Sequence, residues 1–125
     1  MKKTRAKRGQ VDTIKLKKPI VFNFCVITTA IIEIDHINYG LNKRTGQLNK
    51  KARSNFTTND IEKFIMLLDG EYIIADRYIG RSSRFVFRID SPIQGKFFGQ
   101  EFIMIFDTDY DRPEQIHTVT IFPGW

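Results

Sequence analysis

The sequence FTTNDIEKFIMLLDG, residues 56–70, carries the clearest structural signal in the chain. Thr57 is placed to cap the N-terminus of a helix with Asp60 three residues later, and Phe56 and Ile61 have the spacing of a hydrophobic staple. The apolar residues that follow at helical spacing form one stripe: Ile61, Phe64, Ile65 and Leu68. Gly70 is a typical helix stop. The stretch therefore predicts an amphipathic helix that buries one face against the rest of the protein.

Strand-like runs rich in β-branched and aromatic residues follow this helix. They cover residues 72–79, 83–89, 101–106 and 116–122, and turn residues separate them, including Gly80, Pro92 with Gly95, and the acidic stretch 107–113. Such short connections favour an antiparallel meander over parallel crossovers. The sequence thus predicts the α+β class, with an antiparallel β-sheet of four or more strands and one or two helices packed on one face.

The N-terminal part gives weaker signals. Residues 1–10 are a basic arm, and residues 11–18 alternate apolar and charged side chains as an edge strand does, with Pro19 as its expected end. Residues 20–27 predict a further strand. Residues 28–41 have helical spacing but strand composition, and we interpret them as a helix with His36 in its last turn and Gly40 as its stop. The expected organisation is an arm and edge strand over residues 1–18 and a single α+β domain over residues 19–125.

The positive charge is concentrated in two places. The 125 residues carry a formal net charge of +6, yet residues 1–18 alone hold eight Lys or Arg against Asp12, so the remaining chain sums to −1. A second basic segment, residues 43–53, contributes five cations: Lys43, Arg44, Lys50, Lys51 and Arg53. Such polarisation suggests a polyanionic partner such as RNA, although charge runs are often only solvated surfaces.

The lone cysteine and the apolar run bear on localisation. Cys25 excludes an intrachain disulfide, and we expect it to pack as a small hydrophobic residue. Nothing requires an oxidising compartment, so we expect a cytoplasmic, reducing location, with delivery from another cell left open. The apolar run at residues 20–32 is too short to span a bilayer, and no membrane partner is expected.

Candidate ligand-binding side chains follow from the basic segment and from strand alternation. The segment lies close to His36 and resembles a phosphate-facing loop. In the strand at residues 83–89, Arg84 and Arg88 share one face and could line the same groove. The expected substrate-binding residues are therefore Arg44, Lys50, Lys51, Arg84 and Arg88. No zinc spacing, Walker loop or dinucleotide glycine motif occurs, so no metal or cofactor is expected.

Strand alternation also separates two residues near the C-terminus. In the last strand, Thr118 and Thr120 should share one face with Ile116, and His117 should point to the other with Val119. His117 and Thr120 would serve one site only if a bulge re-aimed one of them.

Three short motifs resemble those of small bacterial ribonuclease toxins, the group whose fold is shared by barnase, EndoU, colicin-type and RelE-like nucleases. They are Asp35-His36-Ile37, Arg53-Ser54-Asn55-Phe56 and Thr120-Ile121-Phe122-Pro123. The resemblance implies metal-independent RNA cleavage with His36, Arg53 and Thr120 as catalytic residues. In several such toxins a second histidine follows the first, but this chain has Arg44-Thr45-Gly46 there, so one acid/base group is unassigned.

The chemistry gives these residues definite roles. Cleaving RNA without a metal needs a base for the ribose 2′-hydroxyl, a cation for the phosphorane and an acid for the departing 5′-oxygen. His36 suits the base or acid, Arg53 the phosphate and Thr120 a hydrogen bond to it, so the three should converge. The expected partners are RNA and an inhibitory immunity or antitoxin protein. The alternative is a non-catalytic nucleic-acid-binding or regulatory module on the same fold.

Overall fold

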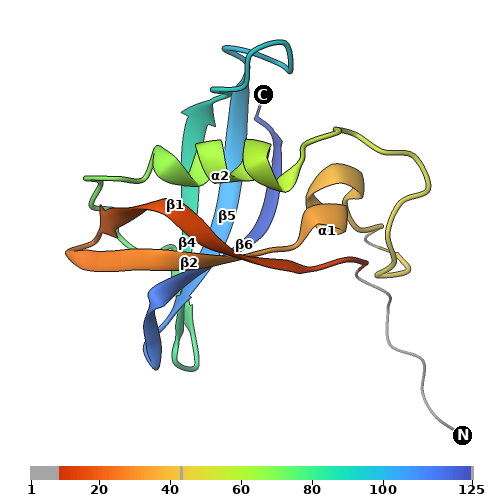
Figure 1. Ribbon diagram of the computed structural model, residues 1–125. Helices are drawn as coiled ribbons and strands as arrows, with labels where there is room; N and C mark the ends of the chain where they lie inside the picture. Colours follow the sequence, from red (N-terminus) through yellow and green to blue (C-terminus); the bar gives the residue numbers. More distant parts are fainter. Residues whose placement is uncertain (1–8, 43, 125) are drawn as a thin grey trace, which may run out of the picture.

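The computed structural model describes residues 9–42 and 44–124, and residues 1–8 of the basic arm lie outside this range. The described residues form six strands and two short helices (Figure 1). In chain order the elements are β1 (Asp12–Phe22), β2 (Cys25–Ile32), α1 (Ile34–Tyr39), α2 (Thr58–Met66), β3 (Arg77–Ile79), β4 (Ser82–Asp90), β5 (Glu101–Asp109) and β6 (Arg112–Pro123).

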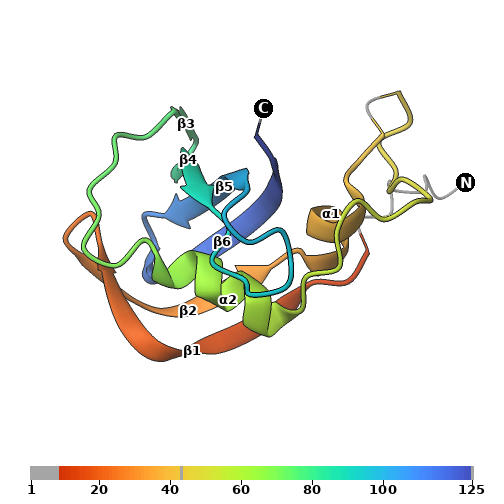
Figure 2. The same cartoon turned by 90° about the horizontal axis from the view of Figure 1, so that it is seen from above.

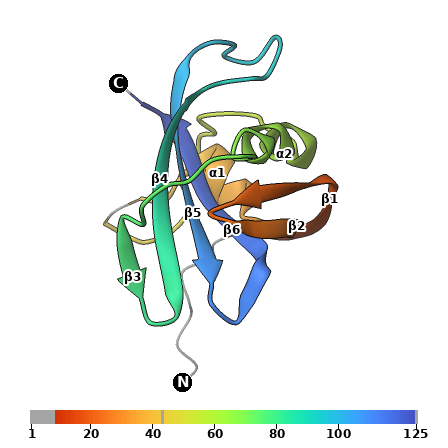
Figure 3. The same cartoon turned by 90° about the vertical axis from the view of Figure 1, so that its left-hand side faces the viewer.

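The strands form one mixed sheet in the order β1-β2-β6-β5-β4-β3. Strands β3 to β6 are the predicted antiparallel meander, and β2 joins β6 in the sheet's parallel pairing. The β1–β2 hairpin turns away from the meander, and α2 lies in the angle between them (Figure 3). The predicted α+β class, with a sheet of four or more strands and one or two helices, is confirmed, although the sheet is mostly rather than wholly antiparallel.

The core fills the angle of this curled sheet. Phe22 of β1 meets Phe85 and Phe106 of the meander with ring centroids 5.1 and 5.3 Å apart, and Phe64 of α2 lies 5.9 Å from Phe102. Each of these rings is buried, and burying such a side chain stabilises the fold by about 1.5–3 kcal/mol. The contacts identify α2 and the β1–β2 hairpin as the cover of one face of the meander.

Helix α2 begins as the sequence predicts. The Thr57 hydroxyl accepts a hydrogen bond from the backbone N–H of Asp60 at 3.1 Å, and the Asp60 carboxylate accepts one from the N–H of Thr57 at 3.0 Å. The helix ends at Met66, earlier than the expected stop at Gly70, because residues 67–70 close the end with turns. Leu68 remains fully buried all the same.

The prediction for residues 19–27 was wrong. Pro19 does not end the first strand, since β1 runs on to Phe22 with irregular pairing between Lys15 and Ile20. Residues 20–27 are not one strand, because a two-residue turn at Asn23 and Phe24 reverses the chain. Both turn residues have positive φ, 49° and 64°, which fits the twist of a tight hairpin although neither is glycine.

Two further elements are shorter than expected, and the prediction for one residue was wrong. The helix expected over residues 28–41 exists only as α1, because Ala30 and Ile32 alternate into the core as β2 residues. The strand expected over residues 72–79 is reduced to β3, since the Asn23 side chain binds the backbone N–H and C=O of Ile73. Cys25 starts β2 beside the turn and is exposed, so it is not the buried hydrophobic residue expected.

Candidate functional site

The face of the meander turned away from α2, here called the outer face, carries three of the predicted site residues: Thr120, Arg84 and Arg88. Cross-strand partners share a face, and here Asp107 pairs with His117 while Ile105 pairs with Thr120. Because Asp107 and Ile105 are two residues apart on β5, His117 and Thr120 lie on the same face. A bulge in β6, where two residues of β6 span one step of β5, produces this change. The expectation that the two residues point to opposite faces was therefore wrong.

Arg53 reaches Thr120 from the loop between the two helices. Its Nη2 donates to the Thr120 hydroxyl at 2.8 Å and to the carbonyl of His36 at 3.3 Å, and its Nε donates to the carbonyl of Ile37 at 3.1 Å. The guanidinium also lies over the ring of Phe122, 5.8 Å from its centroid. Since the two carbonyls belong to the last turns of α1, the cation also complements the negative end of that helix.

The partners of this guanidinium are neutral oxygens. Among the residues that the structure describes, no acidic side chain forms an ion pair with Arg53. Burial of the guanidinium lowers the pKa of Arg53, because desolvation disfavours the charged form. Arginine still keeps its charge at any physiological pH. The outer face therefore holds a cation that no described carboxylate neutralises.

Asn38 of α1 holds the segment that presents Arg53. Its side-chain oxygen accepts from the N–H of Phe56 at 2.8 Å and from the hydroxyl of Ser54 at 3.0 Å, and its amide nitrogen donates to the carbonyl of Phe56 at 2.8 Å. The backbone N–H of Arg53 donates to the carbonyl of Asn38 at 2.7 Å. The direction of the Arg53 side chain is thus tied to α1.

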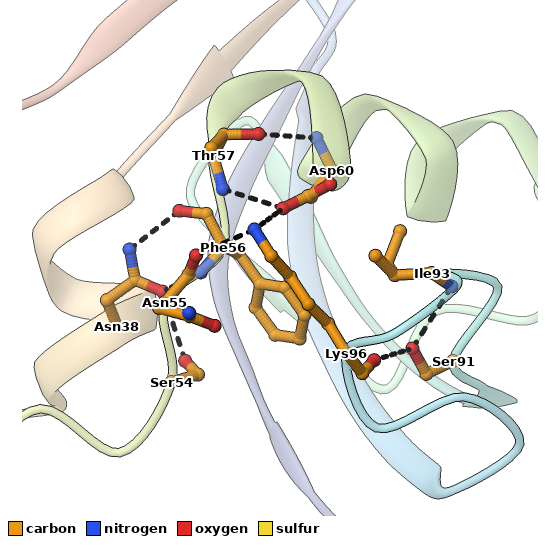
Figure 4. A network of polar contacts seen from close by, with 9 residues as sticks. All are labelled: Asn38, Ser54, Asn55, Phe56, Thr57, Asp60, Ser91, Ile93 and Lys96. Carbon is orange, nitrogen blue, oxygen red and sulfur yellow. Dashed lines mark hydrogen bonds and ion pairs between the residues drawn. The ribbon is translucent and has the colours of Figure 1, made fainter.

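The same segment is tied to the start of α2. Figure 4 shows Lys96, from the loop between β4 and β5, reaching the Asp60 carboxylate at 2.8 Å and the carbonyl of Asn55 at 3.2 Å. Burial alone would raise the pKa of Asp60, but the bonds from Lys96 and Thr57 outweigh it, and the pKa is lowered. Residues 53–60 therefore form a braced connection between the two helices.

His36 contributes its backbone to this arrangement. Its carbonyl accepts from Arg53 and also from the N–H of Gly40, and its ring nitrogen Nδ1 is buried. The structure thus brings together the side chains of Arg53 and Thr120 with the main chain of His36. The catalytic role expected for the His36 ring remains a prediction.

The second histidine is held by a carboxylate. His117 Nε2 lies 2.7 Å from Oε2 of Glu33, a residue at the junction of β2 and α1 that is 4% exposed. Sequence reasoning missed Glu33. The available signal was the position of this carboxylate directly after the apolar run of β2, because a carboxylate next to a buried stretch needs a partner for its charge.

The two arginines of β4 are neutralised by acids of β5. Arg84 forms a bidentate pair with Asp107 at 2.8 and 2.9 Å, and Arg88 pairs with Glu101 at 3.1 Å. The hydrogen bonds to Asp107 raise the pKa of Arg84. Their expected role in substrate binding stays a prediction, but both cations already have carboxylate partners.

The cations of the basic loop lie farther out. Arg44, Lys50 and Lys51 are exposed, and within the described ranges none of them forms an ion pair, while Lys43 lies outside those ranges. The Asn42 side chain accepts from the N–H groups of Arg44 and Thr45, which shapes the loop tip. The loop projects beyond α1 at one end of the molecule (Figure 2). The expected role of these three residues in binding a polyanion stays a prediction.

Two hollows flank the sheet. One, of about 300 Å³, lies on the outer face and is lined by residues that include Ile31, Asp107 and His117. The other, of about 940 Å³, is mostly apolar and lies between the hairpin turns, with Phe22 and Phe85 in its lining. None of the predicted site residues lines the larger hollow.

Comparison with known proteins finds no family model, no curated protein and no solved structure that matches this chain. Neither α1 nor α2 is long enough to cross a membrane, and the described part of the chain holds no other helix. Over residues 9–42 and 44–124, no three His, Cys, Asp or Glu side chains gather in a metal-binding group.

Proposed function

We propose that this chain is a metal-independent endoribonuclease of the toxin type, which cleaves RNA by transferring the phosphodiester to the neighbouring ribose 2′-hydroxyl. The observation that carries the proposal is the Arg53 guanidinium, which is fixed beside Thr120 by neutral oxygens on the outer face of the sheet. A phosphate oxygen is a strong acceptor for such a cation.

The arrangement suits a transition state with added negative charge. Arg53 is oriented before substrate arrives, so little reorganisation is needed when charge builds on the phosphorane. Thr120 offers a hydroxyl to the same phosphate, and Phe122 lies beneath the guanidinium. The exposed cations Arg44, Lys50 and Lys51 would add sequence-independent attraction for the RNA backbone.

A pure stacking platform for nucleic acid is less well supported. Stacking of bases needs exposed aromatic rings. On the outer face, the side chains placed by register between Arg84 and Arg88 and beside them are aliphatic: Val86, Ile103 and Ile105. The ring of Phe122, beside Ile103, is already covered by Arg53. The non-catalytic binding module therefore remains the second candidate, supported by the charge distribution alone.

Purified protein incubated with a labelled RNA in the presence of EDTA tests the proposal. The expected result is fragments that end in a 2′,3′-cyclic phosphate, with their formation lost in Arg53→Ala. Arg81→Ala is the matched control, because Arg81 is an exposed arginine paired with Asp111 at the hairpin end. A wild-type protein that binds the RNA and leaves it intact would refute cleavage and favour the binding module. An inhibitory partner is expected if expression of the active protein arrests growth of the host cell.

A further inference from the structure

The His117–Glu33 pair has the form of an acid/base group with an orienting carboxylate. Glu33 is buried and fixed by its backbone, whose N–H donates to the carbonyl of Thr118 at 3.2 Å. The His117 side chain is 38% exposed and lines the 300 Å³ hollow. The carboxylate thus lies behind the ring, and the ring faces the surface where a ligand can reach it.

The contact with Glu33 defines which ring nitrogen is available. An ionised carboxylate only accepts hydrogen bonds, so the neutral imidazole carries its proton on Nε2 and donates it to Glu33. Nδ1 then has the free electron pair and is the basic atom. A buried acid that orients a histidine in this way is the arrangement by which base and orienting group cooperate in proton transfer.

His117 also lies close to Thr120, the residue that Arg53 binds. Its partner on β5 is two residues from the partner of Thr120, which corresponds to about 7 Å along the strand. A ribose whose 3′-phosphate lies against Arg53 and Thr120 would therefore place its 2′-hydroxyl toward His117. The bulge in β6 is what makes this possible, since regular alternation would leave Thr120 on the opposite face from His117.

We infer that His117 is the general base of the cleavage reaction and that Glu33 is the residue that positions it, an inference that rests on the proposed function. Nδ1 takes the proton of the 2′-hydroxyl as the 2′-oxygen forms its bond to phosphorus. The bond from phosphorus to the 5′-oxygen breaks, and the departing oxygen takes a proton from water. The imidazolium returns its proton to solvent, so one proton moves in total from the 2′-oxygen to the 5′-oxygen.

Three carboxylates and two arginines lie around His117. Asp107 on β5 is held by Arg84 of β4 in a bidentate pair. Asp109 of β5 and Arg112 of β6 are register partners at the edge of the same hollow, and Ile31 of β2 adds no charge. Glu33 is therefore the carboxylate in direct contact with the ring, and an incoming phosphate meets acids that already have cationic neighbours.

The test uses the full chain and two substrates: a short RNA and a uridine 3′-phosphate aryl ester with a good leaving group. His117→Ala should lower the cleavage rate of both by on the order of 10²- to 10⁴-fold and leave RNA affinity unchanged. Because the aryl oxygen needs no proton, a loss confined to RNA would make His117 the acid and overturn its role as base. Added imidazole should restore part of the rate of His117→Ala, which a structural role would not produce.

Variants of the pair separate positioning from folding. Glu33→Gln should slow cleavage by up to on the order of 10⁴-fold, the cost of losing an orienting carboxylate, while Glu114→Gln, an exposed carboxylate on the same strand as His117, should have no effect. His117→Gln keeps a donor for Glu33, so it should unfold at the wild-type temperature yet be inactive. Cleavage by His117→Gln at the wild-type rate would overturn the inference but not the proposed function. A wild-type protein that cleaves neither substrate would overturn both.

Discussion

Arg53 Nη2 donates to Thr120 Oγ1 at 2.8 Å across 67 positions of sequence, and this bond joins the loop before α2 to the last strand of the sheet. The same guanidinium closes the end of α1 through two carbonyl oxygens. One cation thus links three parts of the fold and still has no described acidic partner. A charge placed in this way is costly for the protein alone and favourable once an anion arrives.

Replacing Arg53 should damage both binding and cleavage. Arg53→Ala removes a charge-assisted hydrogen bond to phosphate, worth about 1.5–3 kcal/mol, so the Kd for RNA should rise about tenfold or more. Arg53→Lys keeps the charge but not the planar fork, and should preserve affinity better than rate. Fluorescence anisotropy and single-turnover cleavage measure the two effects. Equal affinity of Arg53→Ala and wild type would exclude a phosphate contact.

Gly40 tests the placement of Arg53 without changing any charge. A Cβ at Gly40 would lie 2.7 Å from Arg53 Nη1, and its φ of +76° is strained for other residues. Gly40→Ala should therefore displace the guanidinium, reduce cleavage toward that of Arg53→Ala, and cost about 1–3 kcal/mol of stability.

Gly95→Ala is the matched control for that variant. Gly95 has the same φ of +76° and nothing within 4 Å of its added Cβ. It should lose stability through backbone strain alone and keep its activity, as urea unfolding and cleavage assays would show. If Gly40→Ala also kept full activity, the position of the guanidinium would not matter for the reaction.

Local chemistry made part of the fold predictable. The capping box of Thr57 and Asp60 is formed by residues three positions apart, so α2 could be located from sequence. The meander followed from short connections between β-branched runs. The turn at Asn23 and Phe24 was missed because no glycine marks it, and its geometry depends on pairing between β1 and β2.

The sequence predicted only those site residues that belong to a recognisable motif. The resemblance brought together Arg53 and Thr120, whereas alternation placed His117 and Thr120 on opposite faces because a bulge leaves no local signal. Glu33 and His117 lie 84 positions apart, and the parallel pairing of β2 with β6 brings them together. Contacts of this kind depend on sheet order, which local patterns do not encode.

Asp60 should make stability depend on pH. Its pKa is lowered from 3.8 in the folded protein, so the unfolded chain binds more protons as the pH falls below about 4 to 5. The stabilisation is complete above the unfolded pKa and is lost as the pH falls through the lower folded value. Urea unfolding at pH 7, 4 and 3 measures it. Between pH 7 and pH 3 the free energy of unfolding should change less in Asp60→Asn than in Asp90→Asn, which replaces an exposed carboxylate and serves as the control.

The N-terminal arm should act on affinity and not on chemistry. Residues 1–8 contain five cations, and Gln10 already contacts Asp35 through its backbone N–H, so deletion of residues 1–8 should leave the fold intact. The slope of log K against log salt should become shallower by about 0.7 for each RNA phosphate that the arm neutralises in the full chain. Cleavage at saturating RNA should stay constant. A salt slope equal to that of the full chain would show that the arm makes no phosphate contacts.

His36→Ala isolates the ring of His36 from its backbone. The carbonyl that accepts from Arg53 belongs to the main chain, so the guanidinium keeps this contact when the side chain is removed. RNA affinity should therefore remain near the wild-type value, because the cations that attract phosphate are untouched. With water as the proton donor to the departing 5′-oxygen, the cleavage rate should also stay near the wild-type value. A fall by on the order of 10²- to 10⁴-fold that disappears with the activated aryl ester would instead make the ring that donor. Unchanged cleavage of RNA by His36→Ala would limit His36 to its backbone contact, and proton transfer would then depend on His117 and water.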